Sequence, residues 1–304
     1  MIITVTPNPA LDLTYHVDAF EAGASLRVDT ARVRAGGKGV NVARVARQAG
    51  ERSIAIAAVG GPTGREFADE LKTSGLDHVL VPASGATRRS VAVVDAASGE
   101  TTIMNERGAP VTADDRAALA SAVRASLPGA RCLVVSGSLP PGMPTAFCAE
   151  LVREAHDAGI PVVVDAVEDA LVEAARAGAD VVKPNRSELR ATTGLADPIA
   201  GARVLLKHGA RLALVSLGAE GMLAVTRDAA LHARMPQPLD GNPTGAGDAA
   251  VAAVAVSIVT GDDDLRSRLV RATAWSASAV LRPVAGELAD NFRDLEHNVG
   301  VMDA

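Results

Sequence analysis

The chain has 304 residues, a formal net charge of −6 and only 2% aromatic residues. This composition excludes a dedicated nucleic-acid-binding protein, which needs basic patches and aromatic platforms, and no apolar run is long enough to span a membrane. The N-terminus lacks the pattern of a signal peptide, and the two cysteines match no metal motif, so we expect a cytoplasmic protein without a disulfide framework.

Short apolar runs alternate with amphipathic stretches along most of the chain. Runs rich in Val and Ile predict buried strands at residues 2–5, 53–59, 132–135, 162–165, 181–183 and 212–216. Helical spacing of apolar residues predicts helices at 40–48, 65–73, 114–126, 144–158, 200–208, 246–259 and 263–281. This order predicts an α/β protein in which helices cover both faces of a mostly parallel sheet, giving three layers.

Two segments break the alternation. Residues 13–33 and 90–105 alternate apolar and polar side chains without intervening helices, which is typical of antiparallel strands with one solvated face. Because both interrupt βα units, we expect them to form one small β-sheet, contributed by residues of about 12–35 and 88–107. We expect this sheet to act as a lid on a single domain of residues 1–304.

The most informative motif opens the predicted helix at 246–259. It reads Asn-Pro-Thr-Gly-Ala-Gly-Asp over residues 242–248. Small residues let a ligand approach the backbone, and the first N–H groups of a helix attract an anion or developing negative charge. A carboxylate such as Asp248 would repel phosphate unless it is needed to take a proton, so the pattern favours phosphoryl transfer to a hydroxyl. Alternatively, Asp248 only stabilises the helix N-terminus.

Two motifs in the first part of the chain suit a sugar. Gly36 and Gly37 precede a predicted helix, on which Lys38 and Asn41 can project to the same side. Asp12 follows the first strand, where ligands of such sheets bind, and its carboxylate can accept two sugar hydroxyls. The alternatives are a flexible loop with a solvated lysine and a turn-forming Asp.

Two later motifs suit a nucleotide. Asn185 and Glu188 are three residues apart at a helix start, so they could organise a Mg²⁺ ion and its waters. The same spacing also fits a variant of the capping box. Ser216 ends a strand and is followed by a glycine turn with Gly218 and Gly221, which could lie against a nucleotide.

Together, and in this order along essentially the whole chain, these motifs resemble the ribokinase/PfkB family of sugar kinases. Within the family they are similar to the branch that holds 1-phosphofructokinase and tagatose-6-phosphate kinase. The resemblance implies a Rossmann-like three-layer α/β/α domain of the ribokinase type with a β-sheet lid. It also implies ATP and Mg²⁺ as cosubstrates and a homodimer through the lids.

The resemblance also implies a role for each motif. Asp248 matches the catalytic base, and Gly245, Ala246 and Gly247 match the anion hole around the transferring phosphoryl group. Sugar-binding positions are matched by Asp12, Gly37, Lys38 and Asn41, and the nucleotide side by Lys183, Asn185, Ser216, Gly218 and Gly221. Asn185 and Glu188 match the Mg²⁺ motif, which acts through water. The cluster that holds an existing sugar phosphate is matched by Arg27, Lys38 and Arg88, with Ser138 beside them.

Some positions depart from this branch. Ser90, preceded by an additional Arg89, stands where Asn is usual, and Ala166-Val167-Glu168 replaces the usual Thr-Ser-Gly after a strand. Asn242-Pro243 is closer to the tagatose-6-phosphate kinases, whereas the glycines that follow are more typical of the phosphofructokinases. These departures leave the sugar open.

The expected function is ATP-dependent phosphorylation of a ketohexose phosphate, either fructose 1-phosphate or tagatose 6-phosphate. Two alternatives remain: a kinase for an unphosphorylated sugar or nucleoside, and a non-catalytic sugar-phosphate sensor. Asp248 and Glu188 argue against a sensor, which needs neither a base nor a metal. A dehydrogenase is the weakest reading, because the loose Gly-x-Gly-x-x-Ala match comes late in the chain with no strand after its helix.

Overall fold

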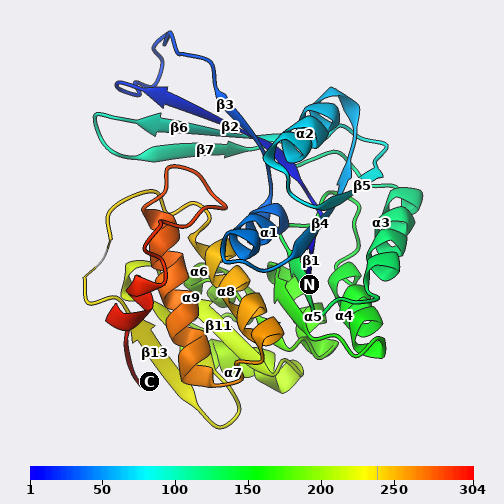
Figure 1. Ribbon diagram of the computed structural model, residues 1–304, viewed down its shortest axis with the longest axis vertical. Helices are drawn as coiled ribbons and strands as arrows, with labels where there is room; N and C mark the ends of the chain where they lie inside the picture. The colour runs from blue at the N-terminus through cyan, green and yellow to red at the C-terminus, as the bar shows by residue number, and fades with distance from the viewer. Residues whose placement is uncertain (238) are drawn as a thin grey trace.

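The computed structural model describes residues 1–237 and 239–304, which contain two β-sheets and the helices around them (Figure 1). Within the described residues, the main sheet has the strand order β14-β13-β12-β11-β10-β9-β8-β1-β4-β5. Its parallel part consists of β1 (Ile2–Thr6), β4 (Ser53–Val59), β5 (His78–Pro82), β8 (Cys132–Ser136), β9 (Val162–Asp165), β10 (Val181–Val182) and β11 (Leu212–Ser216). An antiparallel extension follows with β12 (Met222–Val225), β13 (Ala230–Arg234) and β14 (Gly300–Asp303).

Helices cover both faces of the main sheet. One apolar core joins it to α3 (Ala113–Ser126), α4 (Phe147–Asp157), α5 (Glu168–Arg176), α6 (Arg186–Thr193) and α7 (Pro198–His208). A second core, on the other face, joins it to α1 (Lys38–Gln48), α8 (Ala246–Thr260) and α9 (Leu265–Val280). The predicted three-layer α/β/α class is therefore confirmed.

Helix α8 lies at the centre of the second core. Between Ala249 and Val259, ten of its eleven side chains are buried, and nearly all of them are Ala or Val. A helix that is apolar on all sides needs neighbours on all sides, and α8 packs against α1, α9 and the sheet. This packing fixes the start of α8 at the carboxyl edge of the parallel strands, where α/β proteins bind ligands.

The second sheet has the order β3-β2-β6-β7 and lies at the top of Figure 1, in blue and teal. It consists of β2 (Ala10–Val17), β3 (Arg32–Gly36), β6 (Arg88–Asp95) and β7 (Thr101–Asn105). We call it the lid sheet. Helix α2 (Gly61–Ser74) packs beneath it, where Phe67 and Leu71 share a small core with Leu11 and Ala35.

The lid sheet corrects two details of the sequence prediction. Its two hairpins are antiparallel as expected, but the central pair, β2 and β6, runs parallel. Residues 18–31, which were expected to contribute strand, contain none. That the sheet acts as a lid on a single domain stays a prediction.

None of the helices in residues 1–237 and 239–304 has the length and apolar character needed to cross a membrane.

Candidate active site

A cavity of about 1200 Å³ is lined by residues of both sheets. Sites for one small molecule usually measure roughly 300–1,000 Å³, so this cavity has room for two ligands side by side. Every site residue predicted from the sequence lines it, with the exception of Arg27. The predicted residues therefore meet in one place although they come from the whole length of the chain.

The start of α8 has the geometry that its sequence predicts. Gly245 is its N-cap with φ of 86°, a left-handed conformation that L side chains rarely adopt, and a Cβ there would lie 2.8 Å from Ala285. Asp248 falls in the first turn and is buried, with 6% of its surface exposed. Its Oδ2 accepts a hydrogen bond of 2.9 Å from Nδ2 of Asn41 on α1.

Burial controls the charge of Asp248. Desolvation raises its pKa to about 6, against the opposing effect of the Lys38 ammonium. A carboxyl group with this pKa is mostly ionised at neutral pH and is still basic enough to take a proton.

Two ammonium groups converge on a buried carboxylate in the floor of the cavity. Nζ of Lys38 lies 3.3 Å from Oδ1 of Asp165, and Nζ of Lys183 lies 3.7 Å from its Oδ2. Burial alone would raise the pKa of Asp165, but Lys183 and Lys38 outweigh it and lower the pKa. Nζ of Lys183 also lies so close to Gly247 that a Cβ there would be 3.3 Å away. The arrangement holds positive charge directly against the start of α8.

Asp165 was not among the predicted site residues. The available signal was a carboxylate at the end of a run of three valines, Val162 to Val164, at the carboxyl edge of the sheet. Such a buried charge needs partners, and here both are lysines of predicted motifs.

On the lid side of the cavity, a carboxylate and an arginine lie on neighbouring strands. Burial raises the pKa of Asp12 on β2 to about 7, against the opposing effect of Arg88. The Asp12 carboxylate packs directly over Gly36, where any Cβ would collide with it. Arg88 begins β6 and donates to the carbonyl oxygens of Asn8 at 3.3 Å and Glu106 at 3.2 Å. Ser138 lies beside them, and its Oγ accepts from Nδ2 of Asn8 at 3.3 Å.

At the opposite end, Asn185 and Glu188 form the capping box that their spacing also allowed. Oδ1 of Asn185 accepts from the Glu188 N–H, and Oε2 of Glu188 accepts from the Asn185 N–H, both at 2.8 Å. Oε1 of Glu188 lies on the cavity side, 3.9 Å from Nζ of Lys38. Ser216 is bridged to Asn185, and Gly218 and Gly221 complete this end of the wall.

Arg27 is the one predicted residue that the structure does not bring to the site. It is exposed in the segment between β2 and β3 and does not line the cavity. Several residues that were not predicted do line it, among them Asn8, Arg34, Asn105 and Arg107. Their types are common in loops and strand ends, so the sequence offered no signal for them beyond their place in the lid segments.

Comparison with known proteins agrees with this geometry. The model of the pfkB family of carbohydrate kinases matches residues 6–290. The chain belongs to this carbohydrate kinase family. Among curated pfkB relatives, the chain is 38% identical to a 1-phosphofructokinase of Xanthomonas campestris pv. campestris, over 90% of this chain and 89% of the relative. It is 28% identical to a tagatose-6-phosphate kinase of Staphylococcus epidermidis over the full length of both. A solved pfkB structure, phosphofructokinase-2 from Escherichia coli in complex with fructose-6-phosphate, superposes with a TM-score of 0.88 at 30% identity, covering 97% of this chain and 98% of that one.

Proposed function

We propose that this chain transfers the γ-phosphoryl group of ATP to a hydroxyl of a ketohexose phosphate, either fructose 1-phosphate or tagatose 6-phosphate. The observation that carries the proposal is the buried Asp248 at the start of α8. It lies in one cavity with Lys38, Lys183 and Arg88. This arrangement supplies a base, charge for a transferring phosphoryl group and a separate cation for a second phosphate.

Asp248 takes the proton of the acceptor hydroxyl. Asn41 holds Oδ2, which leaves Oδ1 for the incoming proton. As the hydroxyl oxygen attacks the γ-phosphorus, the bond from that phosphorus to the bridging oxygen breaks and ADP leaves, while negative charge is carried by the phosphoryl oxygens. In this proposal the N–H groups of Gly245 and Gly247 and the ammonium of Lys183 stabilise that charge. The N–H of Ala246 donates to the carbonyl oxygen of Pro243 at 3.2 Å and would have to release that bond to join them.

Mg²⁺ fits the residues at the nucleotide end. Among the described residues no three His, Cys, Asp or Glu side chains are grouped to hold a metal, whereas Mg²⁺ commonly binds through one or two carboxylates, waters and substrate phosphates. Oε1 of Glu188 is outside the capping box and is a suitable oxygen ligand on the cavity wall. With the nucleotide bound, the ion would neutralise phosphate charge there.

The sugar binds under the lid sheet. Asp12 accepts sugar hydroxyls, and Arg88, Lys38 and Ser138 hold the existing phosphate. The similarity to a 1-phosphofructokinase and to a tagatose-6-phosphate kinase supports a phosphosugar over a free sugar.

A second copy of the chain pairs with the lid sheet in this proposal. Large apolar side chains are exposed on its strands and on the segment between β2 and β3: Phe20, Leu26, Val28, Val33, Ile103 and Met104. Such a concentration suits a contact between subunits. Sedimentation of the wild-type chain against Ile103→Lys would test it, with the variant expected to shift to the monomer.

An activity panel tests the kinase proposal. Wild-type protein is assayed with ATP and Mg²⁺ on fructose 1-phosphate, tagatose 6-phosphate, fructose 6-phosphate, fructose and ribose. We expect turnover of a phosphosugar, and a loss of about 10²–10⁴-fold in kcat for Asp248→Asn with ATP binding retained. Asp169→Asn, an exposed position on α5, is the matched control. Near-normal turnover by Asp248→Asn, or a clear preference for fructose or ribose, would contradict the proposal.

A further inference from the structure

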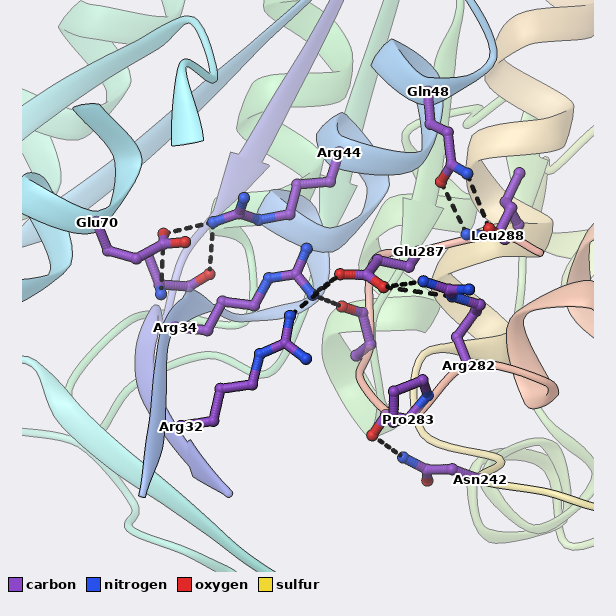
Figure 2. Close-up of polar contacts among 12 residues, drawn as sticks. Arg32, Arg34, Arg44, Gln48, Glu70, Asn242, Arg282, Pro283, Glu287 and Leu288 are labelled. Atoms are coloured by element: carbon purple, nitrogen blue, oxygen red, sulfur yellow. Dashed lines mark hydrogen bonds and ion pairs between the residues drawn. The ribbon is translucent and has the colours of Figure 1, made fainter. Parts of the chain in front are cut away.

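Arg34 of the lid sheet reaches across to a segment near the end of the chain. Figure 2 shows Arg34 pointing from β3 toward this segment, residues 282–288. Its Nη1 donates to the carbonyl oxygen of Ala285 at 2.9 Å and to Oε1 of Glu287 at 3.0 Å. Asp12 lies directly opposite Arg34 in the β2–β3 register. Asp12, which is proposed to bind the sugar, is therefore the cross-strand neighbour of Arg34, which binds residues 282–288.

The segment is anchored on its other sides as well (Figure 2). Oε2 of Glu287 accepts from Nη2 and Nε of Arg282, at 3.1 and 3.3 Å. Gln48 at the end of α1 exchanges two hydrogen bonds of 2.8 Å with the backbone of Leu288. Nδ2 of Asn242, which precedes α8, donates to the carbonyl oxygen of Pro283 at 3.0 Å. Residues 282–288 thus have fixed contacts with the lid sheet, with α1 and with the turn before α8.

Two residues of this segment pack directly on the candidate active site. Ala285 lies against Gly245, with only 2.8 Å to the place a Cβ would take. Gly286 also packs closely against Asn41, because a Cβ there would lie 3.1 Å from its Oδ1. A displacement of the segment would therefore move the N-cap of α8 and the amide that holds Asp248.

We propose that Arg34 and Glu287 are positioning residues, whose ion pair holds residues 282–288 against Gly245 and Asn41 and so couples the lid sheet to the anion-binding turn. The coupling has a mechanical reason. The carbonyl of Ala285 and the carboxylate of Glu287 are both held by one guanidinium nitrogen, so the lid strand cannot shift without pulling on the segment. This inference rests on the proposed function for its kinetic consequences.

Burial and charge distinguish this role from direct substrate binding. The Arg34 side chain is only 15% exposed, and its Nη1 already donates to Glu287 and to the carbonyl oxygen of Ala285. Arg32 pairs with the same carboxylate at 3.6 Å, but its side chain is 53% exposed. An exposed, longer ion pair contributes little, so Arg32 provides a matched control for Arg34.

The experiment compares Arg34→Gln, Glu287→Gln, the double variant and Arg32→Gln. We expect Arg34→Gln and Glu287→Gln each to lower kcat by about 10–100-fold, since small misplacements of a site cost that much. The double variant should lose clearly less than the product of the two single effects, because the two substitutions share the Arg34–Glu287 contact although each also removes contacts of its own. Arg34→Lys, which keeps one cation, should recover part of the loss, and Arg32→Gln should stay close to wild type.

Hydrogen–deuterium exchange provides a readout that does not depend on activity. In the ligand-free protein, Arg34→Gln and Glu287→Gln should speed exchange both in residues 282–288 and in 243–247, by about tenfold or more. A merely structural pair would lower the melting temperature and leave 243–247 unchanged. If Arg34→Gln does not fold, Glu287→Gln and Arg34→Lys carry the same comparison.

The outcomes separate the two proposals. Unchanged exchange in 243–247 overturns the coupling, whatever substrate the enzyme uses. Wild-type turnover by Glu287→Gln, together with a raised KM for the phosphosugar in Arg34→Gln alone, also overturns it and makes Arg34 a direct substrate contact. Faster exchange in 243–247 with no turnover of any phosphosugar by the wild type supports the coupling and contradicts the proposed function.

Discussion

The amide of Asn41 donates a hydrogen bond of 2.9 Å to Oδ2 of Asp248 and thereby joins the first turn of α1 to the first turn of α8. Both side chains are buried. The bond favours the charged carboxylate, so it opposes the burial that raises the pKa of Asp248 to about 6. A residue of the motif proposed to bind the sugar therefore helps to keep the proposed base charged.

Replacing Asn41 by Leu should raise the pKa of Asp248 further. A hydrogen bond to a charged group contributes about 1.5–3 kcal/mol, which corresponds to roughly one to two pH units. The base works only when ionised, so activity is present above its pKa and is lost as pH falls through it. The acidic limb of kcat/KM should therefore move to higher pH. Asn105→Leu, another change in the cavity wall, should leave that limb in place. An unshifted limb in Asn41→Leu would remove Asp248 as the titrating group.

Arg88→Ala should affect phosphosugars selectively. Loss of a guanidinium contact to a dianion should raise the KM for the phosphosugar by about 10–100-fold, because charged hydrogen bonds are worth about 1.5–3 kcal/mol. Arg89→Ala is the control, since Arg89 is the next residue on β6, is exposed and does not line the main cavity. Steady-state kinetics with a phosphosugar and the free sugar measure the difference. Equal losses with both sugars would contradict a phosphate-binding role.

Asp165→Asn should destabilise the fold. Removing one partner of a buried ion pair costs about 3–5 kcal/mol, and here two ammonium groups lose their carboxylate. Because the folded state lowers the pKa of Asp165, its contribution is complete above the ordinary carboxyl pKa and is lost as pH falls through the folded value. Urea unfolding should show a large difference between variant and wild type at neutral pH that shrinks in strong acid.

The control for Asp165 is Asp77→Asn. Asp77 pairs with Arg52 at 3.7 Å, but both side chains are well exposed. Such pairs contribute about 0–1 kcal/mol, so this variant should unfold at nearly the same urea concentration as the wild type. A similar small effect in Asp165→Asn would mean that the two lysines do not depend on the carboxylate.

Glu168→Gly should stabilise the protein by up to about 1 kcal/mol. Among the described residues, Glu168 is the one non-glycine with positive φ, at 53°. The left-handed conformation costs an L residue about 1–2 kcal/mol, which Gly would avoid. Gly also loses more conformational entropy on folding, which lowers the gain in stability by about 0.5–1 kcal/mol. Asp169→Gly, at the next position of α5, should destabilise instead, because its φ is negative and Gly only weakens the helix. Thermal unfolding compares the two, and a lower melting temperature for Glu168→Gly would contradict the strain.

Most of the parallel core was predictable because its strands are short, buried apolar runs, but β5, which is only partly buried, was not predicted. The bounds of β4, β9 and β11 match the expected ranges. The antiparallel strands β12 to β14 were missed, since two of them are only partly buried and their runs resemble loop sequence. The parallel pairing of β2 with β6 was also missed, because alternation tells which face a side chain takes but not which strand lies next to it.

The candidate site was predictable where glycines and charged residues share a short motif. Two such motifs were recognisable because glycine and a charged residue stand close together in the sequence: Gly245 with Asp248, and Gly37 with Lys38. Arg34 was missed because its partners Ala285 and Glu287 lie about 250 residues away in the sequence. Arg27 was expected from the resemblance alone, and the segment between β2 and β3 carries it away from the cavity.

The residues proposed to bind the two substrates come from different parts of the chain. The residues proposed for the sugar all precede residue 140, and those proposed for the nucleotide and the base all follow residue 180. Acceptor and donor recognition are therefore encoded in separate stretches of the gene. Recombination between these two stretches could exchange the acceptor-binding part while leaving the donor-binding part intact. The Arg34–Glu287 pair joins the two parts, so both parent genes would have to encode it.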